Sequence, residues 1–155
     1  MPPLKLALPA LDPRDVKKRI GTSYPAPYAA PCAGREKQAL GDAVGLTQFG
    51  VNLVRVPPGV WSSQRHWHAR EDEFVYVIEG ELVLVTDAGE QVLRAGQAAG
   101  FPAGQADGHH LINRTARDAV YLEVGTRIPG DDVDYPDCDM QIRNDTLQRK
   151  DGTAY

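Results

Sequence analysis

From residue 49 onward, short apolar and β-prone runs alternate with turn residues along the chain. The runs expected to form strands are 49–56, 73–79, 81–86, 91–93, 98–101, 109–113 and 119–124. The sequence Asp-Ala-Gly-Glu at 87–90 is typical of a hairpin turn. Because neither a βα alternation nor a repeat period is present, the pattern predicts an all-β fold, an antiparallel sandwich or barrel.

The strand expected at 73–79 is apolar on both of its faces. Side chains alternate along a strand, which gives one face Glu73, Val75 and Val77 and the other Phe74, Tyr76 and Ile78. A strand with one face in solvent would not show this pattern. The second face should therefore be covered by another sheet, by the N-terminal arm or by a second subunit, and we expect a homodimer.

The two ends of the chain differ from this strand-rich region, which we expect to form a barrel over 46–128. Residues 1–45 hold seven of the 12 prolines, which predict an extended arm that packs on the barrel or on a partner subunit. One short helix is expected at 11–20, capped by Asp12. Residues 129–155 are expected to form an acidic, polar tail, of which the last five residues, 151–155, should be peripheral.

Composition and charge narrow the function. The 155 residues fit one domain, and a hydrophobic content of 42% is enough for a core. The net charge of −4 argues against nucleic acid as a partner. The charge is unevenly spread: residues 1–58 sum to +4, residues 59–125 to −5 and residues 126–155 to −3. The basic run Lys17-Lys18-Arg19 is expected to be a solvated part of the arm.

Cysteine usage and the N-terminus suggest a cellular location. Cys32 and Cys138 lie far apart, and although one disulfide could join them, two free thiols are the simpler interpretation. Neither a signal peptide nor a membrane span is indicated. We expect a cytoplasmic protein with no membrane partner.

All four histidines fall into two tight pairs, which suggests a metal site. In His66-Trp67-His68, the two imidazoles share one face of a strand about 6.5 Å apart, close enough to converge on one ion. The acidic group Glu71-Asp72-Glu73 follows. Glu73 is the best ligand of these three because it opens the next strand on the face of Val75, whereas the other two should lie in the connecting turn.

A third imidazole could come from either member of the second pair. His109 and His110 are adjacent on an expected strand, so only one of them can face inward. Three imidazoles and one carboxylate suit a single divalent transition metal, Fe, Mn, Zn, Ni or Cu, with open positions for water.

These residues resemble the two motifs of the cupin superfamily. The first is matched by Gly59, His66, His68, Glu73 and Gly80, with one extra residue between Gly59 and His66. The second is matched by Gly96, Pro102 and Gly104, but Asp107 stands where the motif has histidine. A two-residue insertion would restore the spacing from histidine to Asn113.

The resemblance covers roughly residues 49–124 and implies a double-stranded β-helix, or jelly-roll barrel, with the metal inside. It assigns His66, His68, Glu73 and His109 as ligands and leaves His110 outward-facing, with Asp107 as the competing fourth ligand.

The resemblance to cupins implies a metal-dependent enzyme that acts on a small molecule, either sugar-phosphate isomerase-like or dioxygenase-like. The alternative is a non-catalytic module that binds or senses a small ligand. An isomerase for phosphates needs a basic lumen, and the −5 of residues 59–125 counts against it. The catalytic residues are not identified; candidates for a general acid or base are Gln64, Arg65, Tyr121 and Glu123.

Overall fold

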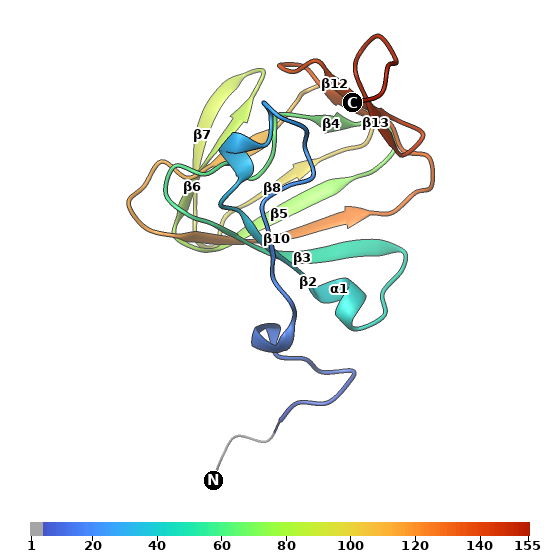
Figure 1. Ribbon diagram of the computed structural model, residues 1–155. Helices are drawn as coiled ribbons and strands as arrows, with labels where there is room; N and C mark the ends of the chain where they lie inside the picture. The colour runs from blue at the N-terminus through green and yellow to red at the C-terminus, as the bar shows by residue number, and fades with distance from the viewer. Residues whose placement is uncertain (1–4) are drawn as a thin grey trace.

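The computed structural model describes residues 5–155, which form three antiparallel sheets (Figure 1). The six-stranded sheet has the order β1-β2-β3-β10-β5-β8, the four-stranded sheet β13-β12-β11-β4 and the three-stranded sheet β7-β6-β9. The strands are β1 (Arg19–Ile20), β2 (Glu36–Ala39), β3 (Phe49–Val56), β4 (Trp67–His68), β5 (Glu73–Glu79), β6 (Glu81–Thr86), β7 (Gly89–Arg94), β8 (Ala98–Phe101), β9 (His110–Ile112), β10 (Ala119–Thr126), β11 (Val133–Tyr135), β12 (Met140–Arg143) and β13 (Thr146–Gln148). The helical turns are η1 (Pro13–Asp15), η2 (Ala30–Cys32) and α1 (Leu40–Ala43).

The main core lies between the six-stranded and three-stranded sheets. Its buried side chains come from both sheets and are Val54, Val56, Val75, Val77, Leu82, Leu84, Leu111, Ala119 and Tyr121. Two antiparallel sheets that share one core in this way form the expected jelly-roll fold.

The turn from β5 to β6 depends on Gly80. Its φ of 78° is strained for any residue with a side chain. A Cβ atom there would lie 2.7 Å from the carbonyl oxygen of Asp118 at the start of β10. The glycine of the first motif therefore lets two segments approach closely and fixes where β5 ends.

The expected strands are confirmed between residues 49 and 126. The bounds of β3, β5, β6 and β8 match the apolar runs, β7 and β10 are slightly longer than their runs, and β9 is shorter. The alternation along β5 is confirmed as well, because Val75 and Val77 are buried whereas Phe74, Tyr76 and Ile78 are 42–48% exposed.

The helix expected at 11–20 is wrong. Only η1 forms, with the Asp12 side chain accepting a hydrogen bond from the backbone nitrogen of Arg14, and the chain becomes extended again at Val16. The segment that follows is β1, which pairs with β2, and β2 pairs in turn with β3. The arm thus extends the main sheet by two strands, and its basic residue Arg19 belongs to a strand rather than to loose chain.

The tail contributes three strands to the fold, whereas residues 151–155 are exposed, as expected. Strand β11 pairs with both β4 and β12, and β12 pairs with β13. The tail builds a second buried cluster of Val133, Tyr135, Cys138 and Met140, against which Tyr24 and Tyr28 of the arm pack. The division at residues 45 and 128 stays a prediction.

Three further expectations concern burial and surface. Cys32 and Cys138 are free and buried. No helix among the described residues is long and apolar enough to cross a membrane. The outer face of β5 is covered neither by another sheet nor by the described part of the arm, so a second subunit stays a prediction.

Candidate metal centre

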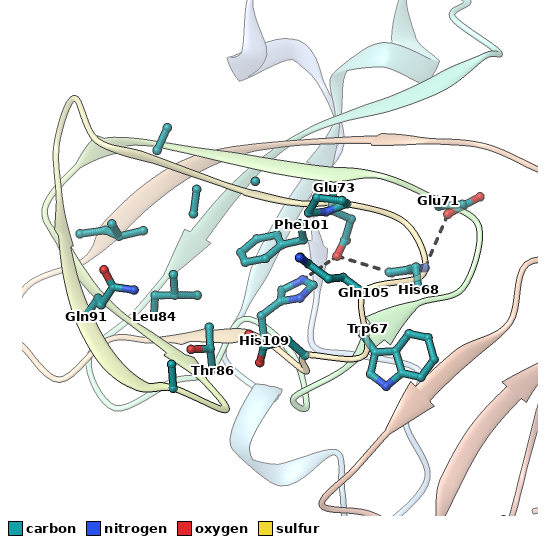
Figure 2. Close-up of a pocket in the computed structure, with 17 residues that line it drawn as sticks. Trp67, His68, Glu71, Glu73, Leu84, Thr86, Gln91, Phe101, Gln105 and His109 are labelled. Atoms are coloured by element: carbon teal, nitrogen blue, oxygen red, sulfur yellow. Dashed lines mark hydrogen bonds and ion pairs between the residues drawn. The ribbon is translucent and has the colours of Figure 1, made fainter.

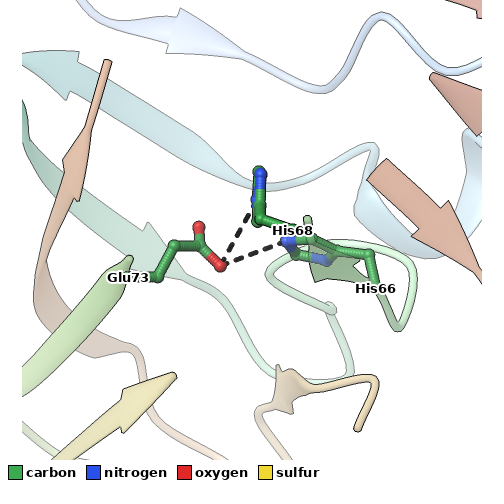
Figure 3. A group of neighbouring side chains, drawn as sticks. All are labelled: His66, His68 and Glu73. Carbon is green, nitrogen blue, oxygen red and sulfur yellow. Dashed lines mark ion pairs between the residues drawn. The ribbon is translucent and has the colours of Figure 1, made fainter. Parts of the chain in front are cut away.

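Local strand pairing brings the two histidine pairs together. His66 and His109 lie opposite each other in an isolated antiparallel bridge, and each backbone nitrogen donates to the other residue's carbonyl at 3.1 and 2.9 Å. His68 lies on β4, two residues further on, opposite Val133 of β11. Glu73 opens β5 and points toward all three rings (Figure 3 shows it with His66 and His68).

The three imidazoles converge on one carboxylate oxygen. Oε2 of Glu73 lies 2.7 Å from Nε2 of His109, 3.3 Å from Nε2 of His66 and 3.5 Å from Nε2 of His68. The ligand atoms of His66, His68 and Glu73 all lie within 4.8 Å of one another. Three nitrogen donors and one oxygen donor that face a single point fit a divalent transition metal. The structure thus brings together the four residues that were expected as ligands.

Contacts at Nδ1 explain the orientation of two of the three rings. Nδ1 of His66 lies 2.8 Å from the carbonyl oxygen of Gln64, and Nδ1 of His68 lies 2.7 Å from Oδ2 of Asp131. An oxygen acceptor at Nδ1 keeps the proton there and leaves the Nε2 lone pair free for a metal. His109 is held differently, because its ring stacks on Phe101 at a centroid distance of 3.5 Å (Figure 2).

Asp131 comes from the tail, where no motif pointed to it. Its side chain is buried, and its second oxygen accepts a hydrogen bond from the backbone nitrogen of Arg70 at 2.9 Å. The carboxylate is therefore fixed on both sides and can orient His68.

The charges at the site depend on these contacts. Burial opposes a charge on His68, but the hydrogen bonds and negative charges of Glu73 and Asp131 outweigh it and raise the His68 pKa to about 9. Burial also opposes ionisation of Glu73, yet the surrounding imidazoles lower the pKa of its carboxyl well below the usual value. For His109, burial dominates and lowers the pKa. At neutral pH and without metal, these shifts favour an anionic Glu73 and a protonated His68.

The other two candidates for the fourth ligand are held by contacts outside the centre, although Asp107 lines a cavity that adjoins it. Oδ1 of Asp107 accepts a hydrogen bond from the backbone nitrogen of Asp87 at 2.7 Å. His110 faces away from Glu73, as expected, and is buried on that side of the strand. Its Nδ1 lies 3.0 Å from the carbonyl oxygen of Ser63, and Trp61 packs edge-on against the ring.

Two cavities adjoin the centre, and Glu71 and Glu73 line both of them. The first, which we call the aromatic cavity, has a volume of about 390 Å³ and includes Trp67, Thr86, Gln91, Phe101 and Gln105 (Figure 2). The second, which we call the basic cavity, has a volume of about 400 Å³ and includes Lys17, Arg19, Lys37, Asn52, Glu123 and Arg127. Both volumes suit a small molecule.

Only one of the four candidate acid–base residues lines either cavity. Tyr121 lies in the main core, where burial raises its pKa well above 10. Arg65 is paired with Asp87 and Asp137, and the buried Gln64 amide donates to the carbonyl oxygen of Tyr28. Glu123 lies on the wall of the basic cavity.

Comparison with known proteins identifies the family. Residues 52–125 match the family described as Cupin domain. A solved structure from Silicibacter pomeroyi, described as a sugar phosphate isomerase from a cupin superfamily, is 48% identical to this chain. It has a TM-score of 0.90 and covers 95% of this chain and 96% of its own. A protein of Acidithiobacillus ferrooxidans, provisionally named as a sugar phosphate isomerase, is 34% identical, with a TM-score of 0.69 over 75% of each chain.

More distant likeness supports the fold alone. The polyketide cyclase RemF of Streptomyces resistomycificus is 24% identical, with a TM-score of 0.61 over 76% of this chain and 78% of that one. No curated protein matches the sequence. Motifs, fold and relatives agree, and the chain belongs to the cupin superfamily.

Proposed function

We propose that the protein is a metal-dependent enzyme that isomerises a small sugar phosphate. The observation that carries this proposal is the convergence of three imidazole nitrogens on one carboxylate oxygen between two cavities. Further support comes from the solved relative of 48% identity, which is named as a sugar phosphate isomerase.

His66, His68, His109 and Glu73 would hold one divalent ion, with Fe, Mn, Zn, Ni and Cu as the metals that suit this donor set. When bound, such an ion polarises a substrate oxygen. The chain's own residues orient the ligands, because the Gln64 carbonyl fixes the His66 ring and Asp131 fixes the His68 ring.

Glu123 is suited to move the proton. Interconversion of an aldose and a ketose shifts a proton between neighbouring carbon atoms, which requires a base beside the substrate. Oε2 of Glu123 lies 2.9 Å from Nζ of Lys37 and accepts a hydrogen bond from Asn52 Nδ2 at 3.1 Å. These contacts hold the carboxylate at the cavity wall, where it can accept the proton and return it.

Isomer formation is the direct test. Metal-stripped protein is reloaded with each of the five ions and incubated with a panel of aldose and ketose phosphates, and the products are identified by NMR. We expect one ion to support turnover. Glu123→Gln should lower kcat about 100-fold or more at unchanged metal content.

A matched control is Glu90→Gln, which removes a carboxylate that is paired with Arg114 and lines neither cavity at the centre. This variant should retain the wild-type kcat. If none of the reloaded proteins forms an isomer, the enzymatic proposal fails, and a non-catalytic ligand-binding module replaces it.

A further inference from the structure

The basic cavity borders the metal centre, and its lining includes four cations and four carboxylates. Lys17, Arg19, Lys37 and Arg127 line it together, and it shares Glu71 and Glu73 with the aromatic cavity. All four cations lie outside residues 59–125, so the charge sum of that region does not describe the lumen. With four cations against four carboxylates, the cavity is less acidic than the sum of −5 suggests, which favours a phosphate substrate.

Strand alternation explains how the arm places its cations here. Lys17, Arg19 and Lys37 line the basic cavity, whereas their chain neighbours Lys18, Glu36 and Gln38 line a separate hollow. The two faces of the β1–β2 edge thus carry different residues, and β2 lies beside β3 in the main sheet (Figure 1).

Buried polar contacts hold this edge in place. The amide of Gln38 donates to the carbonyl oxygens of Pro13 and Val16 at 2.5 and 2.7 Å, directly before Lys17. At the other end of β1, the guanidinium of Arg35 donates to the carbonyl oxygen of Gly21 at 3.0 Å, and the backbone nitrogen of Gly21 donates to the carbonyl oxygen of Arg35 at 2.8 Å. Lys17 and Arg19 are therefore exposed side chains on an anchored backbone.

The four cations differ in their partners. Lys37 is paired with Glu123 at 2.9 Å, and Arg127 with Asp42 at 2.6 Å. Within residues 5–155, neither Lys17 nor Arg19 has a carboxylate within 4.0 Å. Two cations of this cavity thus remain available to an anion in a pocket of about 400 Å³.

Small residues keep the cavity open. Gly50 of β3 and Gly125 of β10 are paired across the strands, and Ala39 lies nearby in the lining. A Cβ atom on Gly50 would lie 3.4 Å from the guanidinium of Arg127, and one on Gly125 would lie 3.6 Å from Cγ of Glu73. The absence of side chains at these two positions leaves space between the basic residues and the metal centre.

We propose that the basic cavity binds the phosphate group of the substrate, with Lys17 and Arg19 as its main ligands, while the reacting end of the molecule lies at the metal centre. This inference rests on the proposed function for the identity of the substrate class. A phosphate oxygen accepts charge-assisted hydrogen bonds from lysine and arginine, and the planar arginine side chain can donate two at once.

Phosphate binding can be measured without turnover. Inorganic phosphate is titrated into the full-length, metal-free protein, with acetate at equal ionic strength as the comparison, and binding is followed by calorimetry and by NMR shifts of the arginine side chains. We expect phosphate to bind more tightly than acetate. The double variant Lys17→Gln/Arg19→Gln should weaken phosphate binding about 100-fold, about tenfold for each lost charged contact.

Lys18→Gln is the matched control, because it makes the same change one residue away on the opposite face, where Lys18 pairs with Glu36. This control should bind phosphate as the wild type does. Equal weakening in both variants, or no preference for phosphate over acetate, would overturn the phosphate site. Phosphate binding that depends on Lys17 and Arg19 in a protein without isomerase activity would uphold the site and refute the isomerase.

Discussion

The two faces of the six-stranded sheet are built from the same strands and carry opposite chemistry. On β5, Glu73 points inward at three imidazoles while its neighbour Phe74 points outward and is 45% exposed. On β10, Glu123 lines the basic cavity, whereas its neighbour Val124 lies opposite Phe74 and shares a separate, apolar hollow with it. Because successive side chains of a strand point to opposite faces, one sheet can carry a polar reactive face and an apolar face suited to association.

Removing two of the imidazoles should have the largest effect on the inner face. Purified protein is expected to carry about one transition metal per chain, and His66→Ala with His68→Ala should abolish this, because two of four donors are lost. Elemental analysis measures the content. Undiminished metal in the double variant would remove the assignment of the centre, while its oligomeric state should not change.

A substitution on the outer face of β5 should change the oligomeric state and leave the metal content unchanged. If Phe74, Tyr76 and Ile78 are covered by a second copy, Tyr76→Asp should convert a homodimer into a monomer, because a buried unpaired charge is strongly unfavourable. Analytical ultracentrifugation measures the mass, and the metal content should remain that of the wild type. A monomeric wild-type protein would contradict the predicted dimer.

A smaller effect should follow from loosening one ligand. Asp131→Asn removes the anionic acceptor at Nδ1 of His68 and should lower metal affinity about 10- to 100-fold. The control Asp134→Asn changes a carboxylate that pairs with Arg143 on the same sheet and should leave affinity unchanged. A chelator competition titration compares the two, and equal affinities would refute the role of Asp131.

The smallest effect expected is the change in metal affinity over a single pH unit. A bound ion needs neutral imidazoles, whereas the raised pKa of His68, about 9, keeps that ring protonated at neutral pH in the metal-free protein. Metal uptake should therefore release a proton, and affinity should rise by up to about tenfold per pH unit until the pH reaches about 9. Calorimetry in buffers of different ionisation enthalpy counts the protons, and an affinity independent of pH would contradict this prediction.

The sequence predicts the central strands well because their signal is local. Alternation and turn residues mark β3, β5, β6 and β8 without reference to the rest of the chain. Strand β2, with the residues Glu-Lys-Gln-Ala, has no such signal. It forms because the edge of β3 offers unpaired backbone groups, a non-local cause that the amino-acid pattern does not carry.

The residues of the site also fall into a group with a local sequence signal and a group without one. The motif spacing indicates His66, His68, Glu73 and His109, and the structure places all four around one point. Asp131 could not be found, because it lies 63 residues from His68 and reaches it only through the pairing of β4 with β11. The charge sum over 59–125 does not describe the cavity for a similar reason, since cations remote in sequence also line it.

Because β2 pairs with β3, the arm brings cations to a cavity beside a metal centre that is built from a different part of the chain. The match to the cupin family spans residues 52–125, which include all four residues of the centre. Lys17, Arg19, Lys37 and Arg127 lie outside it. Substitutions at the three arm positions Lys17, Arg19 and Lys37 would therefore change the lining of the basic cavity while leaving the four residues of the centre unchanged.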